Sequence, residues 1–121
     1  MINYPTLTMI KVKLQIAGVH RWPAADSPEY SYLQHPHRHV FHIEATKQVS
    51  HDDRDIEIIS FKRQIFEYLI NKYWNGTLKM CDFDTLSCEA IGRELLNTFA
   101  LSTVEVLEDN ENGCFIINEL I

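Results

Sequence analysis

The sequence lacks several features that mark broad classes of protein. It has no apolar run long enough to cross a bilayer and no stretch that resembles a secretory leader, so we expect neither a membrane protein nor a secreted one. Its 11 Lys and Arg residues are outnumbered by 17 Asp and Glu residues, which gives a formal net charge of −6. This balance argues against a broad nucleic-acid-binding surface, because such a surface needs clustered cations.

Cysteine is also scarce. Cys81, Cys88 and Cys114 are an odd number of cysteines without a CxxC spacing. This usage indicates reduced thiols in a cytoplasmic protein rather than a disulfide framework. With 121 residues the chain can bury a core of its own, and we expect residues 1–121 to form a single domain.

Histidine, by contrast, is concentrated in one short segment. Four of the six histidines lie within residues 35–42. Alternate side chains of a strand leave the same face, so His37 and His39 can offer two imidazoles to one cation, and a distant third histidine would complete an open zinc site. His35 could replace His37 if the register differs, whereas His42 lies on the opposite face. A polar, partly exposed strand without a metal is the alternative interpretation.

Apolar and polar residues alternate in a way that predicts antiparallel strands at both ends of the chain. The first strand covers Ile10 to Ile16, and the second runs from about His37 to Thr46, after a loop at residues 23–32. Near the C-terminus, residues 104–108 and 114–117 are also strand-like. They flank residues 109–113, a loop whose Asn112-Gly113 is a strong hairpin signal.

Two amphipathic helices are predicted between these pairs of strands. The first takes Asp55 as its cap and has a buried stripe at helical spacing, made of Ile58, Phe61, Ile65, Leu69 and Tyr73. The second begins near Ser87 and has the inward stripe Cys88, Ile91, Leu95 and Phe99. The order β-β-α-α-β-β predicts an α+β domain with both helices on one face of an antiparallel sheet.

Four short segments carry a wider resemblance: Gly18-Val19-His20-Arg21, His37-Arg38-His39-Val40-Phe41, Ser87-Cys88-Glu89 and Val106-Leu107-Glu108. In this order they resemble the 6-pyruvoyl-tetrahydropterin synthase and 6-carboxy-tetrahydropterin synthase family. The resemblance spans nearly the whole chain, and its most specific part is the set of three histidines. It implies the tunnelling fold, in which the sheets of several chains form an oligomeric barrel, as a trimer or a hexamer.

The same resemblance implies roles for individual residues. His20, His37 and His39 would be the zinc ligands, and Glu108 would grip the cyclic amidine edge of a pterin. Arg38 replaces the glycine of the family's His-Gly-His segment and brings a cation near the site, where it could meet a ligand phosphate. The position of Glu108 in its strand, taken alone, leaves open whether the carboxylate faces the apolar side or lies exposed at the hairpin.

Two departures from the family concern catalysis. Residues 31–34 lack the cysteine that the family's synthases carry before the paired histidines, and residues 73–84 contain no histidine of the family's Asp-His pair. We therefore expect an intersubunit pocket that binds a pterin, purine or nucleotide-derived ligand without efficient synthase turnover. The alternative is a zinc-dependent enzyme of pterin or deazaguanine biosynthesis acting on a dihydropterin triphosphate. Its catalytic residues are unknown, and candidates are His35, His51, Asp52, Asp82 and Asp84.

Further interpretations stay open. The aromatic residues Trp22, Tyr30, Tyr32 and Trp74 would suit a protein-interaction domain, or they simply anchor loops and the core. The polar stretch from His51 to Arg54 could form an acid–base group, although a solvated entry to the first helix explains it as well. Phosphates could also meet other cations, which are Arg21, Arg54, Lys62 and Arg63.

Overall fold

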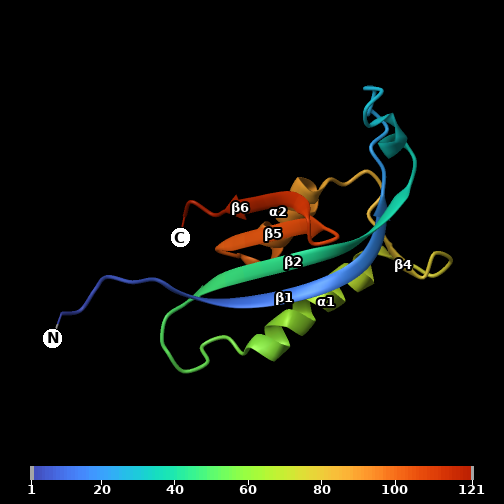
Figure 1. The fold of residues 1–121 in the computed structure, drawn as a ribbon. Helices are drawn as coiled ribbons and strands as arrows, with labels where there is room; N and C mark the ends of the chain where they lie inside the picture. Colours follow the sequence, from blue (N-terminus) through green and yellow to red (C-terminus); the bar gives the residue numbers. More distant parts are fainter. Residues whose placement is uncertain (1, 121) are drawn as a thin grey trace.

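A mixed sheet of six strands and two α-helices make up the fold, seen in a computed structural model that describes residues 2–120 (Figure 1). The elements in chain order are β1 (Thr8–His20), the 3₁₀ turn η1 (Ser31–Gln34), β2 (His37–Val49), α1 (Ile58–Tyr73), β3 (Trp74–Asn75), β4 (Met80–Asp82), α2 (Cys88–Phe99), β5 (Thr103–Glu108) and β6 (Asn112–Ile117). The strand order across the sheet is β3-β4-β1-β2-β5-β6. Strand β4 runs parallel to β1, and the other neighbouring strands are antiparallel.

The long pair β1 and β2 forms the centre of the sheet. Each strand has 13 residues, and their antiparallel register runs from Thr8 opposite Val49 to His20 opposite His37. Side chains alternate between the buried face and the polar face along both strands, as the sequence predicts. The register therefore brings the last residue of β1 beside the first residue of β2.

Both helices pack on the same face of the sheet, as expected from the sequence (Figure 1). Helix α1 packs against β1 and β4, and α2 packs against β5 and β6. The sheet contributes Leu14, Ile43 and Val106 to the core, and the helices contribute Ile65 and Leu95, all of which are almost fully buried. This shared core holds β1, β2 and β5 in fixed relative positions.

The start of α1 differs from the prediction. The N-cap is Glu57, whose carboxylate accepts hydrogen bonds from the backbone N–H groups of Ile59 and Ser60. The expected cap, Asp55, instead accepts from the backbone N–H and the hydroxyl of Ser50, at 2.8 and 3.0 Å. Ile58 is 52% exposed, so the buried stripe begins one turn later, at Phe61. The start of α2 is confirmed, because Ser87 accepts from the N–H of Ala90 at 3.1 Å.

The C-terminal hairpin forms as expected, with its turn at residues 109–111 inside the predicted loop, but β6 begins earlier than predicted, at Asn112. Asp109 and Asn110 both adopt left-handed backbone conformations, with φ of 54° and 59°, and the N–H of Glu111 donates to the carbonyl of Glu108. Gly113 lies within β6, where a Cβ atom would be only 1.8 Å from the carbonyl oxygen of Val106. Gly113 therefore allows β5 and β6 to pair closely, and the turn precedes it in the chain.

The sheet also differs from the predicted antiparallel sheet in size and in strand direction. Strands β3 and β4 have only two and three residues, too few to show a periodic pattern in the sequence. Within one chain the sheet is open, with β3 and β6 at its edges, and does not close into a barrel. The oligomeric barrel stays a prediction. No helix among the described residues is long and apolar enough to cross a membrane.

Gly18 allows the end of β1 to approach the core closely, so we expect Gly18→Ala to destabilise the fold. A Cβ atom at Gly18 would lie 2.6 Å from Cε2 of Phe83 and 3.3 Å from Cε2 of Phe41. The free energy of unfolding should fall by about 1–3 kcal/mol, measured by urea denaturation. At Gly76 nothing lies within 4 Å of the added methyl group, so Gly76→Ala should change stability by less than about 0.5 kcal/mol. Equal effects of the two substitutions would contradict this packing argument.

Candidate metal centre

Three strands bring four potential metal ligands together. His20 ends β1, His37 and His39 begin β2, and Glu108 ends β5. One ligand atom from each of the four lies within 4.8 Å of the others, and all four residues are partly buried. The register explains the convergence: His20 is opposite His37, and Glu108 is opposite Phe41, two residues beyond His39 on the same face. These four side chains could hold a metal ion.

The outward-facing nitrogen of each imidazole is already hydrogen-bonded. The Nδ1–H of His20 donates to the carbonyl oxygen of Leu86 at 2.8 Å, and that of His37 donates to the carbonyl oxygen of His35 at 2.9 Å. The Nδ1–H of His39 donates to Oδ2 of Asp109 at 2.7 Å. Each partner can only accept, so the proton must be on Nδ1 in all three rings. A neutral imidazole then keeps its lone pair on Nε2, the arrangement typical of metal-binding histidines.

Asp109 is held in its place by further contacts with β2. Its Oδ1 accepts from the N–H of Val40 at 2.9 Å, and its own N–H donates to the carbonyl of Val40 at 2.8 Å. The hydrogen bond from His39, followed by the one from Val40, lowers the pKa of Asp109. The carboxylate is therefore ionised at neutral pH and available as an acceptor for His39.

On the other side of the rings, the Nε2 atoms of two imidazoles approach one carboxylate oxygen. Oε2 of Glu108 lies 2.8 Å from Nε2 of His20 and 2.9 Å from Nε2 of His39. Despite that approach, Nε2 of His39 is buried and makes no hydrogen bond within residues 2–120. Lone pairs facing a carboxylate oxygen repel one another unless a proton or a metal cation lies between them. The donor set of three imidazoles and one carboxylate suits a divalent transition metal.

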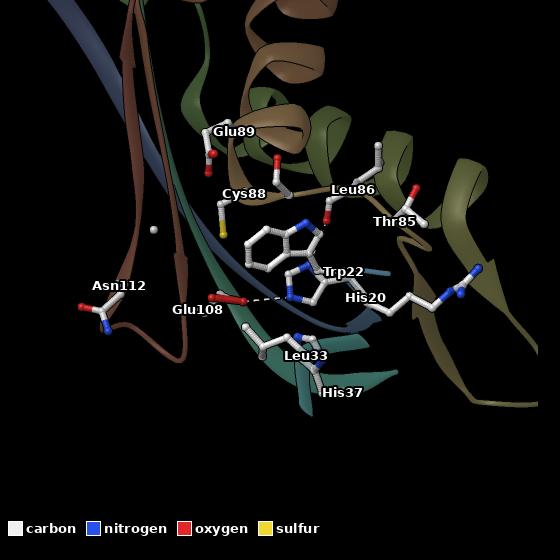
Figure 2. Close-up of a pocket in the computed structure, with 13 residues that line it drawn as sticks. His20, Trp22, Leu33, His37, Thr85, Leu86, Cys88, Glu89, Glu108 and Asn112 are labelled. Atoms are coloured by element: carbon white, nitrogen blue, oxygen red, sulfur yellow. Dashed lines mark hydrogen bonds and ion pairs between the residues drawn. The ribbon is translucent and has the colours of Figure 1, made fainter. Parts of the chain in front are cut away.

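Next to the cluster lies a pocket of about 530 Å³ (Figure 2). Its lining includes His20, His37 and Glu108 from the cluster, so a bound molecule could reach the metal position. Trp22 also lines the pocket, and its indole stacks on the ring of Tyr30 with centroids 5.3 Å apart. The remaining lining combines apolar and polar side chains, among them Leu33, Leu86, Cys88, Glu89 and Asn112.

Cys88 is a pocket residue that the sequence indicated only as part of the core. Its sulfur points toward Glu108 in Figure 2. Burial is the main cause that raises the pKa of Cys88 to about 12, and the charge of Glu108 adds to it. The side chain is therefore a neutral thiol at pH 7, unlike an activated nucleophile.

Other candidate residues lie away from the pocket or are occupied with structural contacts. Arg38 is exposed and alternates with His37 and His39, so it lies on the opposite face of β2 and does not line the pocket. His51 follows Val49, the last residue of β2, and so lies beyond the end of this strand that is opposite to His37. Arg21 does line the pocket, but its Nε lies 3.5 Å from the carboxylate of Asp84.

The structure answers two questions that the sequence left open. His37 belongs to the cluster, whereas His35 contributes its backbone carbonyl as the acceptor for His37. Glu108 faces the same side as the buried Val104 and Val106 and reaches the imidazoles. Sequence reasoning missed Asp109, although its position directly after Glu108, in the loop of the hairpin, could have drawn attention to it.

The contact between Asp109 and His39 predicts that Asp109→Asn weakens metal binding. The amide cannot supply the charged acceptor that orients the imidazole and raises its basicity, so the dissociation constant for Co²⁺ or Zn²⁺ should rise roughly 10- to 100-fold. Competition with a chromophoric chelator measures this. A control in the same turn is Glu111→Gln, because the side chain of Glu111 makes no hydrogen bond or ion pair with residues 2–120. Identical affinities of the two variants would exclude the role of Asp109.

Comparison with known proteins identifies a similar fold and no function. No family model matches the chain, and no curated protein matches it. Among solved structures, it is similar to an uncharacterized protein from Wolinella succinogenes, with a TM-score of 0.67 and 15% identity over 95% of this chain and 100% of that one. At this identity, the likeness shows that the two proteins share a fold.

Proposed function

We propose that this protein is a divergent relative of the pterin synthases with the tunnelling fold, and that it uses a zinc centre and the adjoining pocket to bind a pterin, purine or nucleotide-derived ligand. One observation carries the proposal: three imidazoles, each with its Nδ1–H donated away from the cluster, converge with the carboxylate of Glu108 beside a pocket. Sites that hold a metal only for stability are normally closed to small molecules. Here the cluster opens onto a pocket, which favours ligand binding.

Zinc fits the donors on offer. It accepts imidazole nitrogen and carboxylate oxygen and tolerates a four-coordinate site with one exchangeable position. His20, His37 and His39 would hold it, and Nε2 of His39, buried and without a hydrogen bond in residues 2–120, would gain a partner. Zinc bound there would supply a Lewis acid that polarises a ligand oxygen.

The pocket suits a flat molecule that carries hydrogen-bond donors. Trp22 offers an aromatic face, and the carboxylates of Glu89 and Glu108 outnumber the one lining cation, Arg21, among the described residues. A carboxylate can accept two parallel hydrogen bonds from an amidine or guanidine-like edge, as in a pterin or guanine. In this proposal Glu108 holds that edge. Arg38, on the other face of β2, would reach a ligand phosphate only across a subunit interface.

Efficient synthase chemistry is not part of the proposal. The segment that carries a cysteine in the family forms η1 here, with the sequence Ser-Tyr-Leu-Gln. The pocket lining contains one cysteine, Cys88, whose raised pKa keeps it a thiol. Because a positioned acid or base contributes about a hundred- to ten-thousand-fold, losing two such groups would leave little turnover.

Oligomerisation is included in the proposal because the sheet ends in an unprotected edge. Strand β6 is the last strand, and its Phe115 and Ile117 are each 57% exposed. An exposed apolar edge strand favours pairing with another chain, and a trimer or hexamer arranged as a barrel would cover it.

We expect the purified protein to bind about one zinc ion per chain and the His37→Ala/His39→Ala variant to lose it, because two of three imidazole ligands are removed. Elemental analysis after dialysis against zinc gives the stoichiometry, and circular dichroism verifies folding. His42→Ala is the matched control, since His42 lies on the same strand but on the opposite face. Zinc at full occupancy in the double variant would rule out this site.

We expect the zinc-loaded protein to bind neopterin or guanosine, and Glu108→Gln to weaken binding roughly 10- to 100-fold, because an amide cannot accept both charge-assisted hydrogen bonds. Calorimetry measures the affinity, and Glu67→Gln on the exposed side of α1 is the control. Dihydroneopterin triphosphate tests turnover separately. Rapid zinc-dependent product formation would establish an enzyme instead of a binding protein, and no binding of either ligand would reject the pocket assignment.

A further inference from the structure

The position of Glu108 suggests a role in addition to ligand binding. A single oxygen, Oε2, contacts both His20 and His39, at 2.8 and 2.9 Å, and Glu108 is one of the four residues whose ligand atoms converge. The side chain is 29% exposed, so it lies between the cluster and the open pocket. Its backbone is fixed by β5 on one side and by the turn at Asp109 on the other.

We propose that Glu108 is the fourth protein ligand of the metal ion while the pocket is empty. This inference rests on the proposed function, because it needs the ion bound by the three histidines. The Nδ1 contacts leave the Nε2 atoms available for the ion, and one oxygen of Glu108 lies 2.8 and 2.9 Å from two of them. That oxygen would be the fourth ligand of a four-coordinate site. Three imidazoles and this oxygen make a closed site.

A closed resting site has a consequence for ligand binding. The carboxylate that completes the coordination is the same group proposed to hold an amidine edge. A ligand that takes both oxygens of Glu108 must withdraw it from the ion and so frees the fourth position. Ligand recognition and opening of the metal site are thereby coupled through one side chain. Because the ligand binds only to open sites, its apparent association constant is the intrinsic constant multiplied by the fraction of open sites.

The other carboxylate of the pocket provides a matched control. Glu89 lines the same pocket from the first turn of α2, but it is exposed and is not among the four converging residues. Glu89→Gln therefore removes the same charge as Glu108→Gln without removing a ligand atom from the cluster.

Azide binding to the cobalt-substituted protein tests the inference. The visible absorption of Co²⁺ changes when an added anion enters its coordination sphere. The wild-type spectrum should stay unchanged on azide titration, as should that of Glu89→Gln. Glu108→Gln, whose amide is a weak ligand, should show a saturable spectral change.

Each outcome separates this inference from the proposed function. One outcome is that the wild type binds Co²⁺, that His37→Ala/His39→Ala does not, and that the wild-type spectrum responds to azide as strongly as that of Glu108→Gln. The fourth position is then open, which overturns the inference and leaves the metal site in place. If the wild type binds no Co²⁺, both fail. The wild-type titration alone is decisive even if Glu108→Gln does not fold.

Discussion

The antiparallel register of β1 and β2 is the constraint on which the candidate centre depends. A shift of β1 by one residue would turn His20 to the other face of the sheet and would also exchange the buried and exposed faces of β1. Val12, Leu14 and Ile16 would then meet solvent. The cost of exposing three large apolar side chains, about 1.5–3 kcal/mol each, therefore holds the histidines in position as strongly as it holds the core.

Hydrogen bonds of the Nδ1 atoms orient the three imidazoles of the candidate centre. Two backbone carbonyls and one carboxylate accept the Nδ1 protons, and these acceptors come from three separate loops. Leu86 precedes α2, His35 precedes β2, and Asp109 lies in the β5–β6 turn. Domain packing therefore determines the tautomers of His20 and His39, whereas the tautomer of His37 is fixed by a carbonyl two residues before it. Such outer contacts commonly orient metal-binding histidines.

The shared fold with the Wolinella protein does not decide function, since one fold can support many activities. The proposed ligand binding depends on the pocket beside the cluster and on its chemistry. Two carboxylates, an indole and a neutral thiol line this pocket, and for this reason we proposed recognition of a planar molecule with donor groups instead of acid–base turnover.

Sequence periodicity alone determined the two long strands, the two helices and the shared face of His37 and His39, because each of these depends on neighbours a few residues apart. The same reasoning indicated that Glu108 could follow Val104 and Val106 to the buried side. It failed for the cap of α1, where several polar residues compete for one role, and for β3 and β4, where the pattern is too short.

Only the tertiary structure decided that His20 lies opposite His37 and that Asp109 reaches His39. These facts join residues separated by up to 70 positions in the chain. Such contacts follow from strand register and from the packing of both helices on the sheet. They depend on the summed burial of many side chains, which no local stretch of sequence contains.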